Sequence, residues 1–260
     1  MPVIRILSLN ANTGFDIARR RFVLPALREA VRSVGADVVF LQEVLGHHAG
    51  HARRHPAWPE TAQHEFLAES LWPHHAYGRN AVFPEGHQGN ALLSKFAITQ
   101  HENRDVSVPG HEPRGLLHAI LRMPRRRTLV HVVCVHLGLR EAHRQRQITL
   151  LCRMVESEIP IDAPLIVAGD FNDWRMGGHT LLQRAGLREA FEEAGGRLAR
   201  TFPARWPLLP LDRIYLRNAR ASAVGVLSAR PWSHLSDHAP LFAEVRLDRP
   251  SAGTKTGLPR

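Results

Sequence analysis

Polar side chains stand where several apolar segments of the sequence end. They are Asn10 after "VIRILSL", Glu43 after "VVFLQ", His136 closing "LVHVVCVH" and Asp170 after "LIVAG". Such apolar runs are typical of buried strands, and a buried polar group costs free energy unless it is paired or bound to a cation. These residue types therefore indicate a site in which the groups pair with one another or hold a cation.

The stretch "LIVAGDFNDW" (165–174) carries a second polar group, Asn172, two positions after Asp170. In an extended strand, alternate side chains share a face, so Asp170 and Asn172 are expected to point the same way, with Phe171 opposite. The pattern predicts a carboxylate beside a carboxamide at the end of a buried strand.

Two further segments place polar groups next to apolar strands. Asp212 begins "LDRIYL", and "LSDHAP" supplies Asp237 and His238 just before the last strand. Taken singly, such residues have ordinary structural explanations: a strand-end asparagine often forms a turn, and a strand histidine is often hydrogen-bonded within the structure. Their joint occurrence in this order favours a functional site.

The elements that must position these residues are short strands with a few helices between them. Strands are predicted over 3–9, 36–44, 128–137 and 164–170, and in "GNALLSKFAI", "GLLHAILRM", "LDRIYLR", "ASAVGVL" and "PLFAEVRL". Helices are predicted over about 60–72, 140–158 and 179–186. A further helix is predicted over 16–33, with Asp16 as its N-cap and a kink or delayed start at Pro25. Because hairpins outnumber β-α-β units, the expected fold is α+β, with two packed mixed sheets flanked by helices.

The chain has 260 residues, 44% of them hydrophobic and 22% charged, as in an ordinary globular protein. This length suits one large domain, which we expect to span residues 1–248. The last segment, 249–260, is rich in small and polar residues with proline and glycine, and we expect it to be disordered.

The compartment is suggested by the first residues and the cysteines. The first ten residues alternate into a strand instead of forming the apolar region of a signal peptide, and no run approaches a membrane span in length. Cys134 lies in an apolar run and Cys152 in a helical pattern, so both are expected to be core thiols. These features predict a cytoplasmic protein.

The formal charge of +10 comes from 34 Lys and Arg against 24 Asp and Glu, and arginine supplies nearly all of the cations. Arginine suits bidentate contact with phosphate, so the excess favours an anionic partner. Net charge alone does not separate nucleic acid from anionic lipid.

Seven segments together resemble the endonuclease/exonuclease/phosphatase superfamily, which has the deoxyribonuclease I-like fold. They are "LSLNANTG", "FLQEV", "GNALLS", "VHLG", "VAGDFND", "LDRIYL" and "LSDHAP", and the resemblance runs from about residue 3 to 247. Within the superfamily, the sequence is most similar to a branch of small bacterial cytoplasmic members. The resemblance implies a four-layer αββα sandwich with a site at one end of the two sheets. It also implies hydrolysis of a phosphate ester with Mg²⁺, for which Mn²⁺ is a substitute.

The same resemblance assigns roles within the site. Glu43 matches the principal metal ligand and Asn10 its companion, with Asp237 as a further ligand, and carboxylate and amide oxygens are the donors that Mg²⁺ prefers. His238 matches the residue that activates or positions the attacking water, and Asp212 its partner carboxylate. The remaining pair converges on the phosphate: Asp170 orients the water or accepts its proton, and Asn172 donates to a phosphoryl oxygen.

Other positions distinguish branches of the superfamily. His136 resembles the histidine of deoxyribonuclease I, the sphingomyelinases and the phosphoinositide phosphatases, whereas abasic-site endonucleases have asparagine there. Asn90 and Arg114 match phosphate contacts, although Arg114 also fits a surface arginine before a strand. Asn12 stands where some nucleases carry an acidic residue, which argues against a two-metal scheme. The histidine-rich loop 45–59 fits a substrate-side loop better than a zinc site, since it lacks thiol or acidic partners.

Three functions compete at this point. The first is a Mg²⁺-dependent phosphodiesterase or nuclease acting on nucleic acid. The second is hydrolysis of a phospholipid headgroup or a small phosphorylated metabolite. The third is a non-catalytic binding module on an enzyme scaffold. The presence of a residue of the expected type at every catalytic position argues against this third function.

Overall fold

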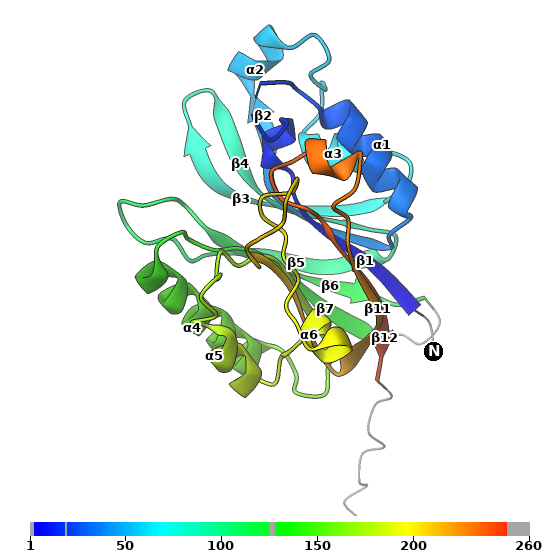
Figure 1. The fold of residues 1–260 in the computed structure, drawn as a ribbon, viewed down its shortest axis with the longest axis vertical. Helices are drawn as coiled ribbons and strands as arrows, with labels where there is room; N and C mark the ends of the chain where they lie inside the picture. The colour runs from blue at the N-terminus through cyan, green and yellow to red at the C-terminus, as the bar shows by residue number, and fades with distance from the viewer. Residues whose placement is uncertain (1–2, 19, 125–127, 249–260) are drawn as a thin grey trace, which may run out of the picture.

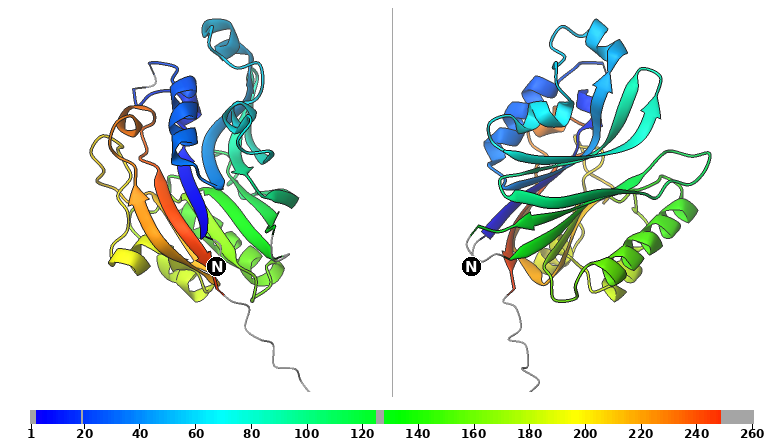
Figure 2. Two further views of the ribbon diagram at one scale, coloured as in Figure 1. Left: turned by 90° about the vertical axis from the view of Figure 1, so that its right-hand side faces the viewer. Right: turned by 180° about the vertical axis from the view of Figure 1, so that it is seen from behind.

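The computed structural model describes residues 3–18, 20–124 and 128–248, and these form two six-stranded sheets packed face to face. The first sheet consists, in spatial order, of β11 (Ala219–Val226), β12 (Leu241–Leu247), β1 (Val3–Asn10), β2 (Val38–His48), β4 (Gly86–Ser94) and β3 (His74–Phe83). The second consists of β5 (Ala97–Asp105), β6 (Gly115–Arg122), β7 (Leu129–His136), β8 (Leu165–Asp170), β10 (Asp212–Arg217) and β9 (Arg188–Glu189). The right-hand view of Figure 2 shows the two sheets stacked.

Helices cover the outer faces of both sheets (Figure 1). The first sheet is covered by α1 (Leu24–Val34) and α3 (Gln63–Ala68), and the second by α4 (Glu141–Glu158) and α5 (His179–Arg184). Two further helices, α2 (Ala49–Arg54) and α6 (Ala190–Gly195), follow β2 and β9. The predicted α+β sandwich of four layers is confirmed. None of the helices in the described part of the chain combines the length and apolarity needed to cross a bilayer.

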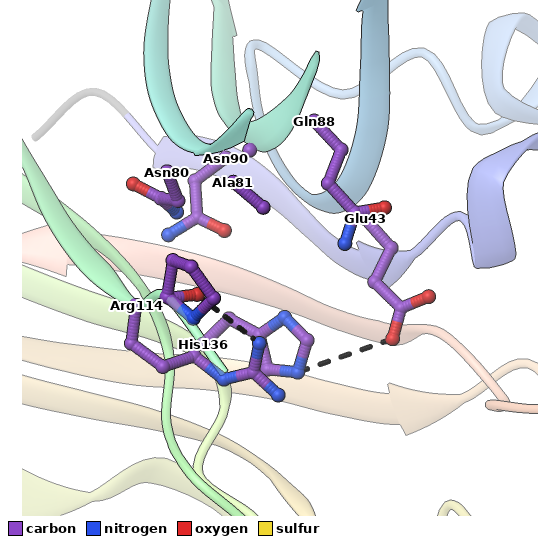
Figure 3. Close-up of a pocket in the computed structure, with 9 residues that line it drawn as sticks. Glu43, Asn80, Ala81, Gln88, Asn90, Arg114 and His136 are labelled. Carbon is purple, nitrogen blue, oxygen red and sulfur yellow. Dashed lines mark hydrogen bonds and ion pairs between the residues drawn. The ribbon is translucent and has the colours of Figure 1, made fainter. Parts of the chain in front are cut away.

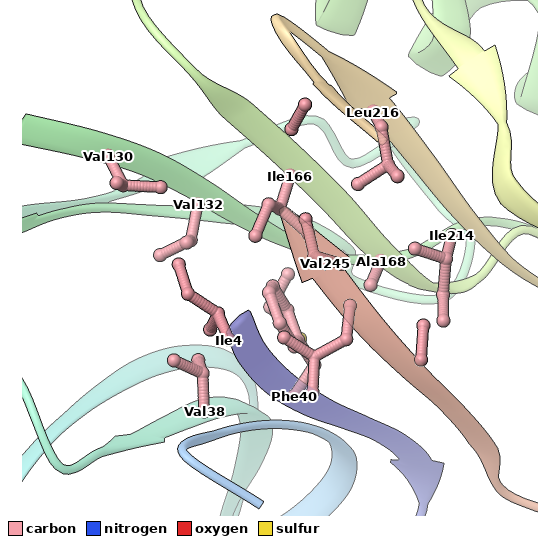
Figure 4. Close-up of a cluster of buried hydrophobic side chains, with 14 of the residues drawn as sticks. Ile4, Val38, Phe40, Val130, Val132, Ile166, Ala168, Ile214, Leu216 and Val245 are labelled. Carbon is pink, nitrogen blue, oxygen red and sulfur yellow. The ribbon is translucent and has the colours of Figure 1, made fainter. Parts of the chain in front are cut away.

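The core between the sheets is built by strict alternation along the strands (Figure 4). Along β1, Ile4 and Ile6 join the cluster between the sheets, whereas Leu7 and Leu9 pack on the helical side. Along β8, Ile166 and Ala168 face inward in the same way. Since side chains alternate with a period of two, the inward row of β8 continues to Asp170, and that of β1 continues through Ser8 to Asn10. The inter-sheet core therefore ends in a polar layer.

That polar layer contains five of the residues singled out from the sequence. They continue the inward rows of β1, β4, β7, β8 and β10, and they are Asn10, Asn90, His136, Asp170 and Asp212. Register joins three of them directly, because Asp170 is opposite both His136 on parallel β7 and Asp212 on antiparallel β10. The sheet geometry thus gathers side chains that are far apart in the sequence.

Several predicted elements differ from those observed. Helix α1 begins at Leu24, because Pro25 fits the first turn of a helix and not its interior, so the delayed start is the alternative that holds. Asp16, predicted as the helix N-cap, instead accepts hydrogen bonds from the backbone N–H groups of Arg20 and Arg21. Within 45–59, β2 continues to His48 and α2 follows, where only a loop was predicted. The segment expected to be disordered, 249–260, lies outside the described residues.

Candidate active site

Asp170 is the centre of the polar layer. Its Oδ2 lies 3.3 Å from Asn10 Nδ2, 3.6 Å from His136 Nε2 and 3.8 Å from His238 Nε2. These groups come from β1, β7 and the segment before β12, so one carboxylate oxygen connects the two sheets. Asn10 Nδ2 also donates to Glu43 Oε1 at 3.3 Å, which places a second carboxylate in the cluster.

The backbone turns immediately after Asp170, and this corrects the expectation of an extended strand through Asn172. Asp170 Oδ1 accepts the backbone N–H of Asn172 at 2.9 Å, and Asn172 adopts a φ of 51°. Strand β8 therefore ends at Asp170, because the aspartate side chain satisfies the backbone donor that a further ladder bond would use. Asn172 Nδ2 donates to the Leu137 carbonyl at 3.0 Å, while Phe171 is buried in the core under α4.

His238 is held by Asp212. Its Nδ1 lies 2.8 Å from Asp212 Oδ2, which leaves Nε2 directed toward Asp170. The hydroxyl of Ser236 fixes this segment: it donates to the Asn10 carbonyl at 2.7 Å and accepts the His238 N–H at 3.2 Å. Ser236 Oγ also lies 3.4 Å from Asp237 Oδ1, so the predicted metal ligand Asp237 stands beside the end of β1.

The charges in this cluster are set by opposing effects. Burial lowers the pKa of His238, but the nearby Asp212 and Asp170 carboxylates outweigh it and raise the pKa to about 10. Burial raises the pKa of Asp170, with Asp212 adding to the effect and His238 opposing it. The pKa of His136 is well below its ordinary value, first through burial and then through Arg114 and His238. At neutral pH, His238 is therefore a cation and His136 is neutral.

Glu43 reaches the cluster through an irregularity in β2. The pairing of β2 with β4 shifts register between Leu41 and Val44, and Glu43 adopts a φ of 51°. A bulge of this kind redirects a side chain that regular alternation would send elsewhere. Glu43 Oε1 thereby lies 4.0 Å from His136 Nε2 as well as close to Asn10. Its side chain keeps one fifth of its surface exposed, so solvent reaches this carboxylate.

The donor set fits a hard divalent cation. The carboxylates of Glu43 and Asp237 lie beside the end of β1. Asn10 Oδ1 accepts the Asn12 N–H there at 3.0 Å and keeps a second lone pair, and such oxygen donors suit Mg²⁺. A second arrangement in the described part of the chain also has metal-ligand spacing, since single ligand atoms of Asp170, Asp212 and His238 lie within 4.8 Å of one another. In this group, the 2.8 Å contact of His238 Nδ1 with Asp212 Oδ2 is a hydrogen bond, so these two atoms are paired with each other.

A small pocket opens beside Glu43 and His136 (Figure 3). It is lined by Glu43, Asn80, Ala81, Gln88, Gly89, Asn90, Pro113, Arg114 and His136. Asn90 donates to the carbonyls of Gly115 and Cys134, and its Oδ1 is buried without a hydrogen-bond partner among the described residues. Arg114 Nε donates to the Leu137 carbonyl at 3.2 Å, so its guanidinium is fixed at the pocket and is not a free surface group.

The histidines of 45–59 pack with aromatic rings at the end of β2. His51 stacks on Trp58 with ring centroids 5.2 Å apart, and His55 contacts Phe15 and Phe22. The backbone N–H of His51 donates to His48 Nδ1, which uses one of the nitrogens that a zinc ion would need. These contacts give the loop a packing role next to the site.

Two residues of the site were not found from the sequence. Ser236 links His238 to β1, and its place inside "LSDHAP" was the available signal. Phe202 has its ring centroid 5.1 Å from that of His238, and no sequence pattern indicates this contact because 36 positions separate the two. Asn12, which stands where some nucleases carry an acidic residue, uses its amide to donate to the carbonyls of Phe15 and Asp16.

The fold and the polar layer together define a class of protein: an α+β sandwich with an acidic, histidine-containing site at one end of its two sheets. The chain belongs to the Endonuclease/Exonuclease/phosphatase family, whose model matches residues 7–238. Members of this family are phosphoester hydrolases.

A curated protein is similar to this chain along nearly its whole length. The uncharacterized protein YbhP of Escherichia coli strain K12 is 55% identical over 244 residues, which cover 94% of this chain and 96% of that protein.

Solved structures share the fold at low sequence identity. An endonuclease/exonuclease/phosphatase from Beutenbergia cavernae superposes with a TM-score of 0.76 at 18% identity, covering 96% of this chain and 73% of that one. TDP2 of D. rerio, complexed with a single-strand DNA product, superposes with a TM-score of 0.69 at 18% identity. The match covers 95% of this chain and 100% of that one. The mannosyl-6-phosphatase Bt3783 of Bacteroides thetaiotaomicron superposes with a TM-score of 0.69 at 17% identity. The match covers 94% of this chain and 100% of that one.

Proposed function

We propose that this protein is a Mg²⁺-dependent phosphodiesterase that hydrolyses a phosphate ester with an activated water molecule. The observation that carries the proposal is the position of Asp170 Oδ2, within 3.8 Å of an amide and two histidines from separate elements. A carboxylate, a charged imidazole and a neutral imidazole around one point can position a phosphate and exchange protons with it.

Asp170 and His238 divide the proton chemistry. Asp170 accepts the proton of the attacking water, since burial raises its pKa toward the range in which a carboxylate works as a base. His238 stays protonated beside Asp212 and offers its Nε2–H to the phosphate, where it stabilises developing negative charge.

The other polar residues hold the phosphate ester. His136, which is neutral at pH 7, donates one hydrogen bond to the phosphate ester. Arg114 brings a fixed positive charge to the same side of the site. Asn172 is oriented by the Leu137 carbonyl and has a second N–H for a phosphoryl oxygen. Asn90 donates to the Gly115 and Cys134 carbonyls and keeps only its Oδ1, an acceptor, for a donor group of the substrate. A well-fixed group loses little entropy on binding, which favours catalysis by positioning.

Glu43, Asn10 and Asp237 would hold the cation. Bound there, Mg²⁺ would neutralise phosphate charge and polarise the ester. The cytoplasm is the compartment that we propose, because both cysteines are buried free thiols.

The substrate class has two candidates. TDP2 was solved with a single-strand DNA product and Bt3783 is a mannosyl-6-phosphatase, so proteins of this fold act on different phosphate esters. The arginine excess of this chain suits nucleic acid and anionic lipid alike.

The test is hydrolysis of bis-(p-nitrophenyl) phosphate by the purified protein. We expect turnover with Mg²⁺ or Mn²⁺, loss of turnover in EDTA, and recovery when Mg²⁺ is returned in excess. Circular dichroism in EDTA serves as the control that chelation leaves the fold intact. Absence of turnover with every divalent cation tested would favour the non-catalytic binding module.

A further inference from the structure

Large apolar side chains are exposed on three loops at the site end of the second sheet. The loops follow β7, follow β8 and precede β10, and the exposed side chains are Leu139, Trp174, Met176, Trp206, Leu208 and Leu209. Trp206 is 67% exposed, and Leu139 and Leu208 are each 62% exposed. Soluble proteins seldom gather such residues on one surface unless something binds there. We call this set of six residues the apolar rim.

Two buried arginines join the three loops beneath the apolar rim. Arg144 Nη1 donates to the Leu139 carbonyl at 2.6 Å, and its Nε lies 3.9 Å from Asp173 Oδ1. Arg213 Nη2 donates to the Asp173 carbonyl and contacts the Pro210 carbonyl at 3.4 Å. Since Asp173 precedes Trp174, and Pro210 follows Leu209, the loops share their supports and form one surface.

The charge of this surface is positive. Arg140, Arg175 and Arg205 are exposed on the same loops, and the carboxylate of the adjoining Glu141 is paired with the buried Arg144. The guanidinium of Arg175 lies 4.5 Å from the ring centroid of Trp174, and that of Arg205 lies 4.8 Å from the centroid of Trp206. Each exposed indole therefore carries a cation against one face.

The apolar rim adjoins the reacting groups. Phe202, at the start of the loop that carries Trp206, contacts the ring of His238. In the same loop, the Ala204 N–H donates to the Asp237 carbonyl at 2.7 Å. A surface docked on the rim would therefore present its phosphate groups beside His238.

The composition favours a lipid bilayer over nucleic acid. Single-stranded nucleic acid uses aromatic faces for stacking and has no use for exposed leucine and methionine. Aliphatic side chains gain free energy when they enter the apolar part of a bilayer, and tryptophan and arginine suit the headgroup level. Arginines around the rim match the negative potential of an anionic leaflet.

We propose that the apolar rim docks this protein on an anionic phospholipid surface, and that its substrate is a phosphate ester held at that surface. The assignment of the substrate rests on the proposed phosphodiesterase activity, whereas docking itself does not. Tryptophan and leucine enter the headgroup region, and Arg140, Arg175 and Arg205 contact lipid phosphates.

The experiment is cosedimentation with vesicles in EDTA, so that binding is measured without turnover. One set contains equal parts of phosphatidylcholine and phosphatidylglycerol, and the other contains phosphatidylcholine alone. We expect wild-type protein to partition onto the anionic vesicles at least about tenfold more strongly than onto the neutral ones, because each arginine near the surface contributes. Replacing both Trp206 and Leu208 by serine should weaken anionic partitioning by at least about tenfold.

A matched control is available at the opposite end of the sandwich. Ile161 is 79% exposed there, and Ile161→Ser should leave partitioning unchanged. Thermal unfolding of both variants checks that they are folded. Two results would overturn docking: equal partitioning of wild type and the Trp206/Leu208 variant, or no partitioning of either.

The nucleic-acid alternative is tested on the same proteins. A Trp206/Leu208 variant that loses affinity for a single-stranded oligonucleotide but keeps its vesicle binding would also overturn the proposal. Hydrolysis of bis-(p-nitrophenyl) phosphate by the wild type is measured separately. Vesicle binding without hydrolysis would support docking on lipid and contradict the proposed phosphodiesterase activity. Hydrolysis without vesicle binding would support the phosphodiesterase activity and contradict docking on lipid.

Discussion

Two histidines in different regions of this molecule are equally buried and yet differ in charge. His238 in the candidate active site and His64 on α3 are each 6% exposed. Burial lowers the pKa of His64 to about 4, with His75 adding to the effect. At His238 the same effect of burial is outweighed by Asp212 and Asp170, and the pKa is about 10. Burial alone therefore does not decide the charge of a histidine; carboxylates close to the ring do.

The surroundings of His64 explain its neutral state. Its ring stacks on Tyr77, with centroids 4.7 Å apart and an interplanar angle of 5°, and its Nδ1 has no hydrogen-bond partner among the described residues. This region uses histidine as an aromatic packing residue. The site region uses histidine as a cation that two carboxylates stabilise, which is typical of functional sites.

The largest effect is expected from His238→Ala. Removal of the charged imidazole should lower the hydrolysis rate by about a thousandfold, because positioned acid–base groups contribute factors of this size. Steady-state rates on bis-(p-nitrophenyl) phosphate measure the effect. The matched control is His234→Ala, an exposed histidine in the same segment, which should keep the wild-type rate. A rate for His238→Ala within tenfold of wild type would contradict the assignment.

Asp212→Asn should make His238 resemble His64. The change keeps the side-chain shape but removes the carboxylate bonded to Nδ1, so the pKa of His238 should fall. NMR titration of the metal-free protein follows this pKa directly. The hydrolysis rate should fall by about a hundredfold, less than for loss of the imidazole. An unchanged pKa would show that Asp170 alone holds the charge.

His64→Phe should remove acid sensitivity from the other region. The pKa of His64 is about 4 in the folded protein and 6.5 when unperturbed, so its contribution to stability is complete above pH 6.5 and is lost as the pH falls toward 4. The full loss is about 3 kcal/mol, of which about 2 kcal/mol is already lost at pH 5.

The measurement is urea unfolding of wild type and His64→Phe at pH 7 and pH 5. The variant should be the more stable protein at pH 5 and close to wild type at pH 7, because phenylalanine preserves the stack on Tyr77. His101→Gln, at an exposed histidine, should retain the wild-type response to acid. Equal losses of stability in wild type and His64→Phe would disprove the interpretation.

The smallest effect is expected from His75→Asp. The ring centroids of His75 and His64 are 5.3 Å apart, and the positive charge of His75 lowers the pKa of His64. A carboxylate there should reverse this contribution and raise the pKa of His64, as carboxylates do at His238. NMR titration compares His75→Asp with His75→Asn, in which the repulsion is removed but no negative charge is added. If the pKa rises equally in the two variants, the added carboxylate has no effect of its own.

The candidate site shows where sequence-based prediction succeeds and where it stops. Alternation along β1 and β8 predicts the strands, and Asn10 and Asp170 continue their inward rows. Prediction was wrong after Asp170, because the aspartate side chain captures the Asn172 N–H and ends the strand. The delayed start of α1 at Pro25 was one of the predicted alternatives, but the N-cap was wrong, because Asp16 accepts the Arg20 N–H in a turn that precedes the helix.

Binding surfaces were harder to predict than the site. The sequence shows tryptophans near the motifs, yet their exposure depends on neighbouring loops. Trp232 is buried under the first sheet's helices, whereas Trp174 and Trp206 are exposed. Arg144 and Arg213 resemble any other arginines in the sequence, although they are almost fully buried beneath the apolar rim.

The sequence by itself determined which residues stand at strand ends and which face of each strand they share, because these follow from a local period of two. Only the tertiary structure decided that Asn10 and Asp170, 160 positions apart, lie 3.3 Å from each other. Their strands belong to different sheets, and that distance depends on how two apolar inner faces pack. The bulge that turns Glu43 toward them likewise arises from pairing between β2 and β4, which no single strand encodes.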